Sequence, residues 1–385
     1  MREVVIVEAV RTPMGRRNGG LSPVHPVNLG AHVLKELVSR AGIDPSLVED
    51  VSCGCVSQMG EQGLNVGRQA VLTAGWPYTI PAMTVDRQCG SSQQAVHIAA
   101  NQVASGIIDI AVAMGIESMS RVPLGSTVTS GCGEPNPPEL TAMYDLVHQG
   151  VSAERIAKKW GISRRECDEF GAMSQQRAAR ARAEGLFEAE IAPVTVTVDG
   201  EQKTVKEDAG IRPGTTAAGI AGLKPVFLPD GVLTAANSSQ ITDGAAALLL
   251  MTAEKAAELG LRPRARIVAQ AVVGSDPELM LTGPITATPK VLDKAGMRLA
   301  DMDVVEINEA FAPVVLAWER ELNPDMDKVN PLGGAIALGH PVGATGARLM
   351  TTMLNHLERT GGRFGLQTMC CGGGLATATI IERIN

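Results

Sequence analysis

Two stretches of the chain, KELVSRAGIDPSLVEDVSCGCV (residues 35–56) and KVLDKAGMRLADMDVVEINEA (residues 290–310), follow one pattern. In each, apolar residues at helical spacing end at an Ala-Gly pair. The glycine of this pair is Gly42 in the first stretch and Gly296 in the second. An acidic connection then leads into a Val-rich run that is typical of a buried strand. The repeat predicts two copies of one α/β unit within the chain.

A second pair of segments supports this duplication. The runs DIAVAMGIES from Asp109 and GLQTMCCGGG from Gly365 each combine a short apolar strand with a turn. Strands that alternate with helices at this spacing favour mostly parallel sheets covered on both faces. We therefore expect an α/β fold in which two sheets are stacked between helices and share a central helical layer.

Residues 119–242 interrupt the repeated pattern and predict an inserted loop domain. They contain a Pro-rich connection (EPNPPEL), a long polar helix and a hairpin-like stretch (APVTVTVDGEQKTV). Ser163 and Glu166 form a capping box at the start of the helix, Gly185 follows its last turn, and its polar sequence favours a solvated helix. The rest of the chain divides into an N-terminal half, residues 1–118 and 243–265, and a C-terminal half, residues 266–385.

Charge and terminal sequences limit the possible partners and location. The 385 residues carry a formal net charge of −7 without a basic run, which argues against nucleic acid or an anionic membrane as a partner. The first residues, MREVVIVEAVRTPMG, lack the apolar core of a signal peptide, and no stretch is long enough to span a bilayer. The final Glu-Arg-Ile-Asn differs from the peroxisomal Ser-Lys-Leu signal, so we expect a cytoplasmic protein.

Seven cysteines at irregular spacing favour thiol chemistry or buried small residues over a disulfide framework. Cys53 and Cys55 fall within a predicted strand, and no second Cys/His pair stands at ligand spacing. We therefore expect no metal site.

Cys89 is the first candidate for a catalytic residue. In TVDRQCGSSQQAVHIAANQVASG (residues 84–106), an extended stretch turns at Cys-Gly into a helix that ends at Gly106. A thiol at a helix N-terminus is favoured as thiolate, the form that attacks a carbonyl. The alternative is a small buried residue at a turn.

His340 is the second candidate. It lies in NPLGGAIALGHPVGATGARLM (residues 330–350), where glycines allow close approach of the backbone before a helix that begins near Ala344. A histidine between Gly339 and Pro341 is well placed to act as a base near neutral pH. A solvent-exposed loop histidine is the alternative.

Two further motifs follow predicted strands. In LQTMCCGGGLATATIIERI (residues 366–384), Cys370 or Cys371 precedes a glycine turn whose N–H groups could stabilise an oxyanion, and the residues alone do not choose between the two cysteines. In VVEINEAFAP (residues 304–313), the polar Asn308 and Glu309 end an otherwise buried strand. Asn308 could instead cap the next helix.

These motifs resemble the thiolase family, and the match runs essentially from one end of the chain to the other. Asn-Glu-Ala-Phe (308–311), Gly-Gly-Ala-Ile-Ala-Leu-Gly-His-Pro (333–341) and Cys-Cys-Gly-Gly-Gly (370–374) occur in the order of the family. The resemblance implies a duplicated thiolase fold: two mixed sheets with layered helices (αβαβα) and an inserted CoA-binding loop domain.

The resemblance also implies a role for each catalytic candidate. Cys89 would attack the 3-keto carbon and carry the shortened acyl group, with His340 lowering the proton affinity of the thiol. Cys370 would act as acid and base. Asn308 would fix a water that forms one oxyanion hole with His340, and the N–H groups of Cys89 and Gly372 would form the other.

Coenzyme A is the implied co-substrate, with no permanently bound cofactor. The positions that correspond to contacts of the family with CoA are His148, Arg212, Phe227, Ala235, Ser239, Ala310 and Phe311. Three positions near them depart from residues common in the family, namely Gln149, Gly219 and Gln240.

The resemblance implies thiolytic cleavage of a 3-ketoacyl-CoA by CoA, in the degradation of fatty acids or steroid side chains. Cys-Gly-Ser-Ser-Gln-Gln from Cys89 and Ser-Ser-Gln-Ile before Asp243 are closer to bacterial degradative thiolases. A biosynthetic acetoacetyl-CoA thiolase, a decarboxylating ketosynthase and an acyl-CoA or sterol carrier are the alternatives. The family implies a homotetramer, or else a dimer.

Overall fold

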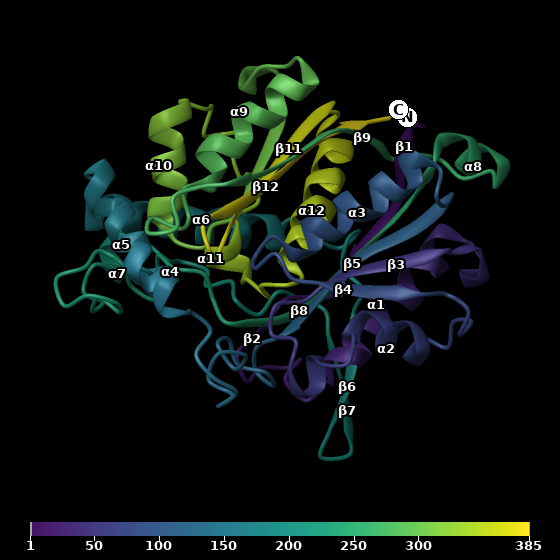
Figure 1. Ribbon diagram of the computed structural model, residues 1–385, viewed down its shortest axis with the longest axis horizontal. Helices are drawn as coiled ribbons and strands as arrows, with labels where there is room; N and C mark the ends of the chain where they lie inside the picture. Colours follow the sequence, from purple (N-terminus) through teal and green to yellow (C-terminus); the bar gives the residue numbers. More distant parts are fainter. Residues whose placement is uncertain (1, 385) are drawn as a thin grey trace.

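The computed structural model describes residues 2–384 as a layered α/β structure (Figure 1). The strands of the main sheet and its short side pairing are β1 Val4–Arg11, β2 Gly15–Arg16, β3 Asp50–Gly54, β4 Ala82–Val85, β5 Ile110–Ser118, β8 Thr242–Thr252, β9 Ala265–Gly274, β10 Val304–Ile307, β11 Phe364–Cys371 and β12 Leu375–Arg383. The helices outside the insertion are α1 Pro26–Ala41, α2 Val66–Thr73, α3 Ser91–Ser105, α8 Ala253–Glu258, α9 Gly283–Ala295, α10 Ala312–Leu322, α11 Ala335–Leu338 and α12 Thr345–Thr360.

The predicted repeat is confirmed element by element. Helices α1 and α9 both end at a glycine in the left-handed region, Gly42 with φ 70° and Gly296 with φ 65°. A 3-10 turn follows each helix, Pro45–Leu47 in the first copy and Leu299–Asp301 in the second, and leads into β3 or β10. Glycine is favoured at both ends because a side chain is strained at these dihedral angles.

The layers follow the predicted order of helices and sheets. Helices α3 and α12 lie in the centre, and their apolar residues share one core with strands from both halves. Helices α1 and α2 cover the outer face of the N-terminal strands, and α9 and α10 cover that of the C-terminal strands. The α/β class is confirmed.

The structure refines the expectation of two sheets. Hydrogen bonding gives one continuous order, β10-β11-β12-β9-β1-β8-β5-β3-β4, which joins the two halves. Only two pairs connect β1 to β9, Val5 with Arg266 and Ile6 with Ala265. Both strands are edge strands of their own half, so their free backbone groups can pair where they meet.

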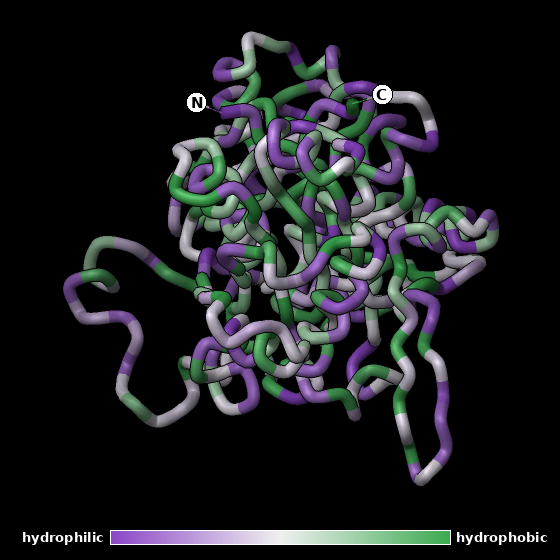
Figure 2. Tube along the Cα trace, turned by 90° about the vertical axis from the view of Figure 1, so that its right-hand side faces the viewer, coloured by the Kyte–Doolittle hydropathy of each residue, from purple (hydrophilic) through white to green (hydrophobic). Residues whose placement is uncertain are grey.

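The segment between β5 and β8 contains the predicted helix and hairpin. Its elements are α4 Pro138–Met143, α5 Gln149–Trp160, α6 Arg164–Ala183, β6 Val194–Val198, β7 Glu201–Val205 and α7 Ala217–Ile220. The hairpin β6–β7 extends beyond the body of the molecule, with an apolar β6 and a polar β7 (Figure 2).

Helix α6 confirms one expectation and contradicts another. The capping box between Ser163 and Glu166 is present. However, the prediction of a solvated helix is wrong, because one face of α6, including Phe170, Ser174 and Gln175, is buried. Small and polar residues on that face obscured its amphipathic character in the sequence.

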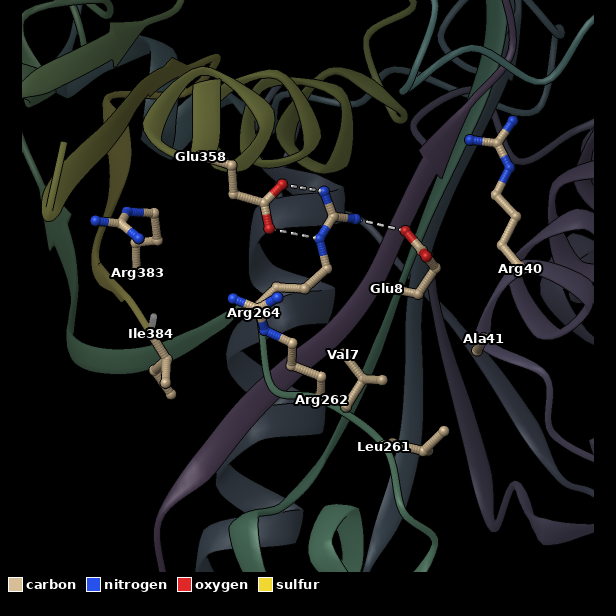
Figure 3. Close-up of a pocket in the computed structure, with 10 residues that line it drawn as sticks. All are labelled: Val7, Glu8, Arg40, Ala41, Leu261, Arg262, Arg264, Glu358, Arg383 and Ile384. Carbon is tan, nitrogen blue, oxygen red and sulfur yellow. Dashed lines mark hydrogen bonds and ion pairs between the residues drawn. The ribbon is translucent and has the colours of Figure 1, made fainter. Parts of the chain in front are cut away.

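A pocket of about 440 Å³ lies where the two halves meet, and Figure 3 shows its charged lining. Arg264, just before β9, donates to both oxygens of Glu358 on α12 at 2.9 and 2.6 Å. It also donates to Glu8 on β1 at 2.5 Å. One guanidinium therefore links β1, β9 and α12.

We expect Arg264→Met to lower the free energy of unfolding by about 2 kcal/mol, since it leaves two partly buried carboxylates without their shared partner. Urea unfolding followed by circular dichroism measures the change. Arg262→Met is the matched control, because Arg262 lines the same pocket but is exposed and makes no hydrogen bond to the described residues. Equal losses in both variants would contradict this role of Arg264.

Candidate active site

Four segments far apart in the sequence meet at the carboxyl ends of β4, β10 and β11. Cys89 lies in the turn between β4 and α3, and Asn308 follows β10. Cys370 lies at the end of β11, and His340 lies in the loop between α11 and α12. Open α/β folds commonly build their binding sites at these strand ends.

Asn308 joins two of the other candidates. Its Nδ2 lies 3.7 Å from Sγ of Cys370 and 3.4 Å from Nε2 of His340. The side chain is fully buried, and its Oδ1 has no hydrogen-bond partner in the structure. The alternative role as a helix cap is wrong, because the residue at the cap position of α10 is Phe311.

His340 is buried and held from both sides. Its Nδ1 lies 2.6 Å from Oγ1 of Thr345, and that hydroxyl donates to the carbonyl oxygen of Pro341 at 2.9 Å. Since the hydroxyl proton is used in this way, the hydroxyl accepts from Nδ1, and Nε2 is left as a proton acceptor facing Asn308. Burial and the positive charge of Arg348 lower the pKa of His340 to about 3, so the ring is neutral.

Cys89 lies immediately before the start of α3 and is almost fully buried. Burial raises the pKa of its thiol well above the ordinary value, and the neighbouring Cys370 adds to this effect. The backbone N–H groups of Gly372 and Cys89 act in the opposite direction, as donors to the sulfur. We expected the helix N-terminus to favour thiolate; burial is the larger effect, and the resting form is the thiol.

The structure distinguishes the two adjacent cysteines. Cys370 faces Asn308, and burial raises the pKa of its thiol to about 12 despite that contact. Cys371 points to the other side of the strand and packs against Gly90, where an added Cβ would lie 2.6 Å from its sulfur. Alternate side chains of a strand face opposite sides, so only Cys370 faces Asn308, whereas Cys371 packs in an apolar cluster beside Cys89.

A buried carboxylate, Glu309, shapes the loop that carries His340. It accepts hydrogen bonds from Oγ of Ser174 at 2.7 Å, Nδ2 of Asn330 at 2.9 Å and the N–H of Ile336 at 3.2 Å. It also lies where a side chain at Gly334 would stand, which accounts for glycine there. Glu309 is therefore a structural clamp on the loop before His340.

A second carboxylate, Glu117 at the end of β5, holds the other side of this loop. It accepts from the N–H groups of Val56, Ser57 and Gly343 at 2.8 to 3.0 Å, and from Gln62 at 2.7 Å. Neither this residue nor Thr345 was predicted from the sequence to serve the site. A lone carboxylate at the end of the apolar run of β5 was the only signal for Glu117.

The positions implied for CoA contacts fall into three groups. The rings of His148 and Phe227 stack with centroids 5.4 Å apart, and Phe227 meets Phe311 edge-on at 5.7 Å. The N–H of Ser239 donates to the carbonyl oxygen of Ala310 at 2.9 Å, which ties this segment to the end of β10. Two further positions, Arg212 and Ala235, are exposed.

The three departures from the family pattern have different surroundings. Gln240 uses Nε2 to donate to the carbonyl oxygens of Gly210, Ile336 and Ala337 at 2.8 to 3.1 Å, so it braces the His340 loop. Gly219 is exposed in α7, and Gln149 begins α5.

Two kinds of feature are absent from residues 2–384. No three His, Cys, Asp or Glu side chains among them are grouped so that they could hold a metal ion. No helix in that range combines the length and apolar character needed to cross a bilayer.

Comparisons with known proteins agree with this geometry. The family profile "Thiolase, N-terminal domain" matches residues 4–254, and "Thiolase, C-terminal domain" matches residues 261–383. These matches identify the protein as an enzyme of the acyltransferase class. The chain belongs to the thiolase family.

Individual relatives are similar over nearly the whole chain. Steroid 3-ketoacyl-CoA thiolase FadA6 of Mycobacterium tuberculosis is 48% identical, with 100% of this chain and 95% of that protein covered. The 3-ketoacyl-CoA thiolase of Bacillus subtilis is 44% identical, with 99% and 100% covered. The crystal structure of the Bacillus anthracis acetyl-CoA acetyltransferase superposes with a TM-score of 0.92 at 40% identity, covering 100% of this chain and 99% of that one.

Proposed function

We propose that this enzyme cleaves 3-ketoacyl-CoA with CoA, in the degradation of fatty acids or steroid side chains. The observation that carries the proposal is the position of Asn308, whose amide lies next to both His340 and Cys370. The names of the degradative relatives from Mycobacterium tuberculosis and Bacillus subtilis support this direction.

In the first half-reaction, Nε2 of His340 takes the proton of the Cys89 thiol. The sulfur attacks the 3-keto carbon, and the N–H groups of Gly372 and Cys89 stabilise the resulting oxyanion. The bond between C2 and C3 then breaks, and its electron pair forms the enolate of acetyl-CoA. The thiol of Cys370, whose raised pKa keeps it protonated, donates its proton to C2.

In the second half-reaction, the Cys370 thiolate takes the proton of the incoming CoA thiol. The CoA sulfur attacks the thioester on Cys89, and the Cys89 sulfur leaves and recovers its proton from His340. Each catalytic group is then back in its starting protonation state, and the proton from the CoA thiol replaces the one that Cys370 gave to acetyl-CoA. Asn308 orients both proton-carrying groups through one amide.

We also propose how the rest of the chain serves this reaction. CoA is the co-substrate, no further cofactor is required, and CoA lies along His148, Phe227 and Phe311. Arg212 faces its phosphates as an exposed cation, and the segments around Ala235, Ser239 and Ala310 line its pantetheine arm. The division into two halves and an inserted CoA-binding segment, a homotetramer or dimer, and a cytoplasmic location belong to the same proposal.

The test is CoA-dependent loss of 3-ketoacyl-CoA across a panel from acetoacetyl-CoA through long chains to a steroid with a 3-keto side chain. Preference for long or steroid substrates supports the proposal. Preference for acetoacetyl-CoA would instead support a biosynthetic acetoacetyl-CoA thiolase. The similarity to acetyl-CoA acetyltransferases is the observation that favours this second candidate. Binding without cleavage would identify an acyl-CoA or sterol carrier and overturn the proposal.

We expect Thr345→Val to lower kcat for thiolysis by about 10²-fold, because His340 loses the hydroxyl that fixes its ring and tautomer. Steady-state kinetics measures the change. Thr351→Val is the matched control, since Thr351 lies on the same helix but donates only to the carbonyl oxygen of Ala347. A similar fall in both variants would show that Thr345 acts through the stability of α12.

A further inference from the structure

Two buried groups of opposite charge lie behind the catalytic residues and have no role in the mechanism above; each is the largest charge influence on the other, without a direct salt bridge between them. Arg348 on α12 and Glu306 on β10 are both completely buried. Among residues 2–384, none of the three side-chain nitrogens of Arg348 and neither carboxylate oxygen of Glu306 has a hydrogen-bond partner. Charged groups in protein interiors are almost always paired or bound to ordered water, so this arrangement requires an explanation.

The two side chains continue the elements that hold His340. Thr345, Arg348 and Thr352 are spaced along one face of α12, at positions i, i+3 and i+7. Thr345 contacts Nδ1 of His340, whereas Thr352 donates to Glu190 at 2.9 Å. Arg348 therefore lies on the helix face between His340 and a buried carboxylate.

Strand β10 shows the same arrangement. Glu306 precedes Asn308 by two residues in extended chain, so their side chains leave the backbone on the same side. Asn308 contacts His340 directly. On both elements, then, a residue that contacts His340 has a buried charged neighbour on the same face.

Other charged groups around these two residues are paired, although Oε2 of Glu190 has no hydrogen-bond partner among the described residues. Arg11 on β1 donates to Glu190 at 2.6 Å and to both oxygens of Asp208 at 2.7 and 2.9 Å. The charges of these three groups affect the pKa of Arg348, but among the charged neighbours Glu306 has the largest effect.

The pKa of Glu306 depends on its burial and on three charged neighbours. Burial raises its pKa to about 8, the positive charge of Arg348 opposes this rise, and Glu309 and Glu190 add to it. Its carboxyl group thus changes charge near physiological pH. The charge of Arg348 in turn disfavours a second positive charge on His340.

We propose that Glu306 and Arg348 are a positioning pair that controls how readily His340 accepts the proton of Cys89. Arg348 opposes the imidazolium form of His340, and ionised Glu306 cancels this opposition. The inference rests on the proposed thiolase mechanism, in which Cys89 attacks after its proton moves to His340. Neither residue contacts the reacting atoms.

The rate of alkylation of Cys89 by iodoacetamide tests this without any substrate. Peptide mass spectrometry resolves Cys89 from the other cysteines, and the rate is measured from about pH 6 to about pH 10. In the natural chain we expect an additional rise in rate near pH 8, where Glu306 ionises. We expect Glu306→Gln to lose this rise and to be alkylated about tenfold more slowly above it.

Arg348→Met is the decisive partner variant. We expect its Cys89 to be alkylated about tenfold faster at neutral pH, because His340 then accepts a proton more readily. A purely structural role would instead speed alkylation in both variants, because looser packing exposes the buried thiol of Cys89. That result, or an unchanged pH profile in Glu306→Gln, overturns the inference.

Two measurements keep the test conclusive. Arg348→Lys retains the positive charge, so we expect it to keep the pH profile of the natural chain even if Arg348→Met fails to fold. A changed profile in Arg348→Lys would contradict the charge argument. Thiolysis is assayed separately on the same preparations. Absent turnover in the natural chain overturns the proposed function, whereas the alkylation profile decides the role of Glu306 and Arg348.

Discussion

We expect Cys89→Ala to abolish formation of the acyl-enzyme and to lower thiolysis by at least about 10⁴-fold. The reason is geometric as well as chemical, because the N–H of Gly372 lies against the Cys89 sulfur. Cys370 lies nearby but faces the amide of Asn308. Mass spectrometry of the intact chain after exposure to acyl-CoA measures the acyl group directly.

The control for this experiment is Cys132→Ala. Cys132 is exposed, so it reports any nonspecific transfer of acyl groups to an accessible thiol. We expect this variant to acquire one acyl group and to turn over normally. Acylation of the Cys89→Ala chain at Cys370, with normal turnover, would show that the roles of the two cysteines are reversed.

The fold could be predicted from the sequence because its repeat is local. A helix that ends at Gly42 or Gly296 and a following apolar strand are set by neighbouring residues. The pairing of Val5 with Arg266 was not predictable in this way. It depends on where two edge strands from different halves meet, which no local pattern records.

The residues of the site were also predictable from the sequence, but their protonation and the direction of their side chains were not. The sequence placed Cys89 at a helix start and therefore predicted an acidic thiol, whereas its pKa is raised because the thiol itself is buried. It also left Cys370 and Cys371 undecided, since the side of β11 that faces the site depends on sheet packing.

Supporting residues escaped prediction because their partners are distant. Glu309 is clamped by Ser174, which lies 135 positions away along the chain. Ser174 itself lies on α6, whose polar sequence favoured a solvated helix. A polar side chain buried by one long-range contact leaves no periodic pattern.

We expect Cys370→Ala to lower turnover by about 10³-fold while leaving Cys89 able to accept an acyl group. Without the Cys370 thiol, neither the enolate of acetyl-CoA nor the thiol of incoming CoA has a proton-transfer partner next to Asn308. Exposure to acyl-CoA should therefore still yield some acyl-enzyme by mass spectrometry, and exchange of solvent deuterium into acetyl-CoA should be lost.

The adjacent cysteine supplies the matched control for that variant. Cys371→Ala removes a buried thiol of the same size, but one that packs against Gly90 on the other side of β11. We expect it to lower the free energy of unfolding by about 1 kcal/mol and to keep turnover within about threefold of the natural chain. If Cys371→Ala stopped deuterium exchange and Cys370→Ala did not, the acid and base would be Cys371. The contact between Asn308 and Cys370 would then serve only to hold the strand end in place.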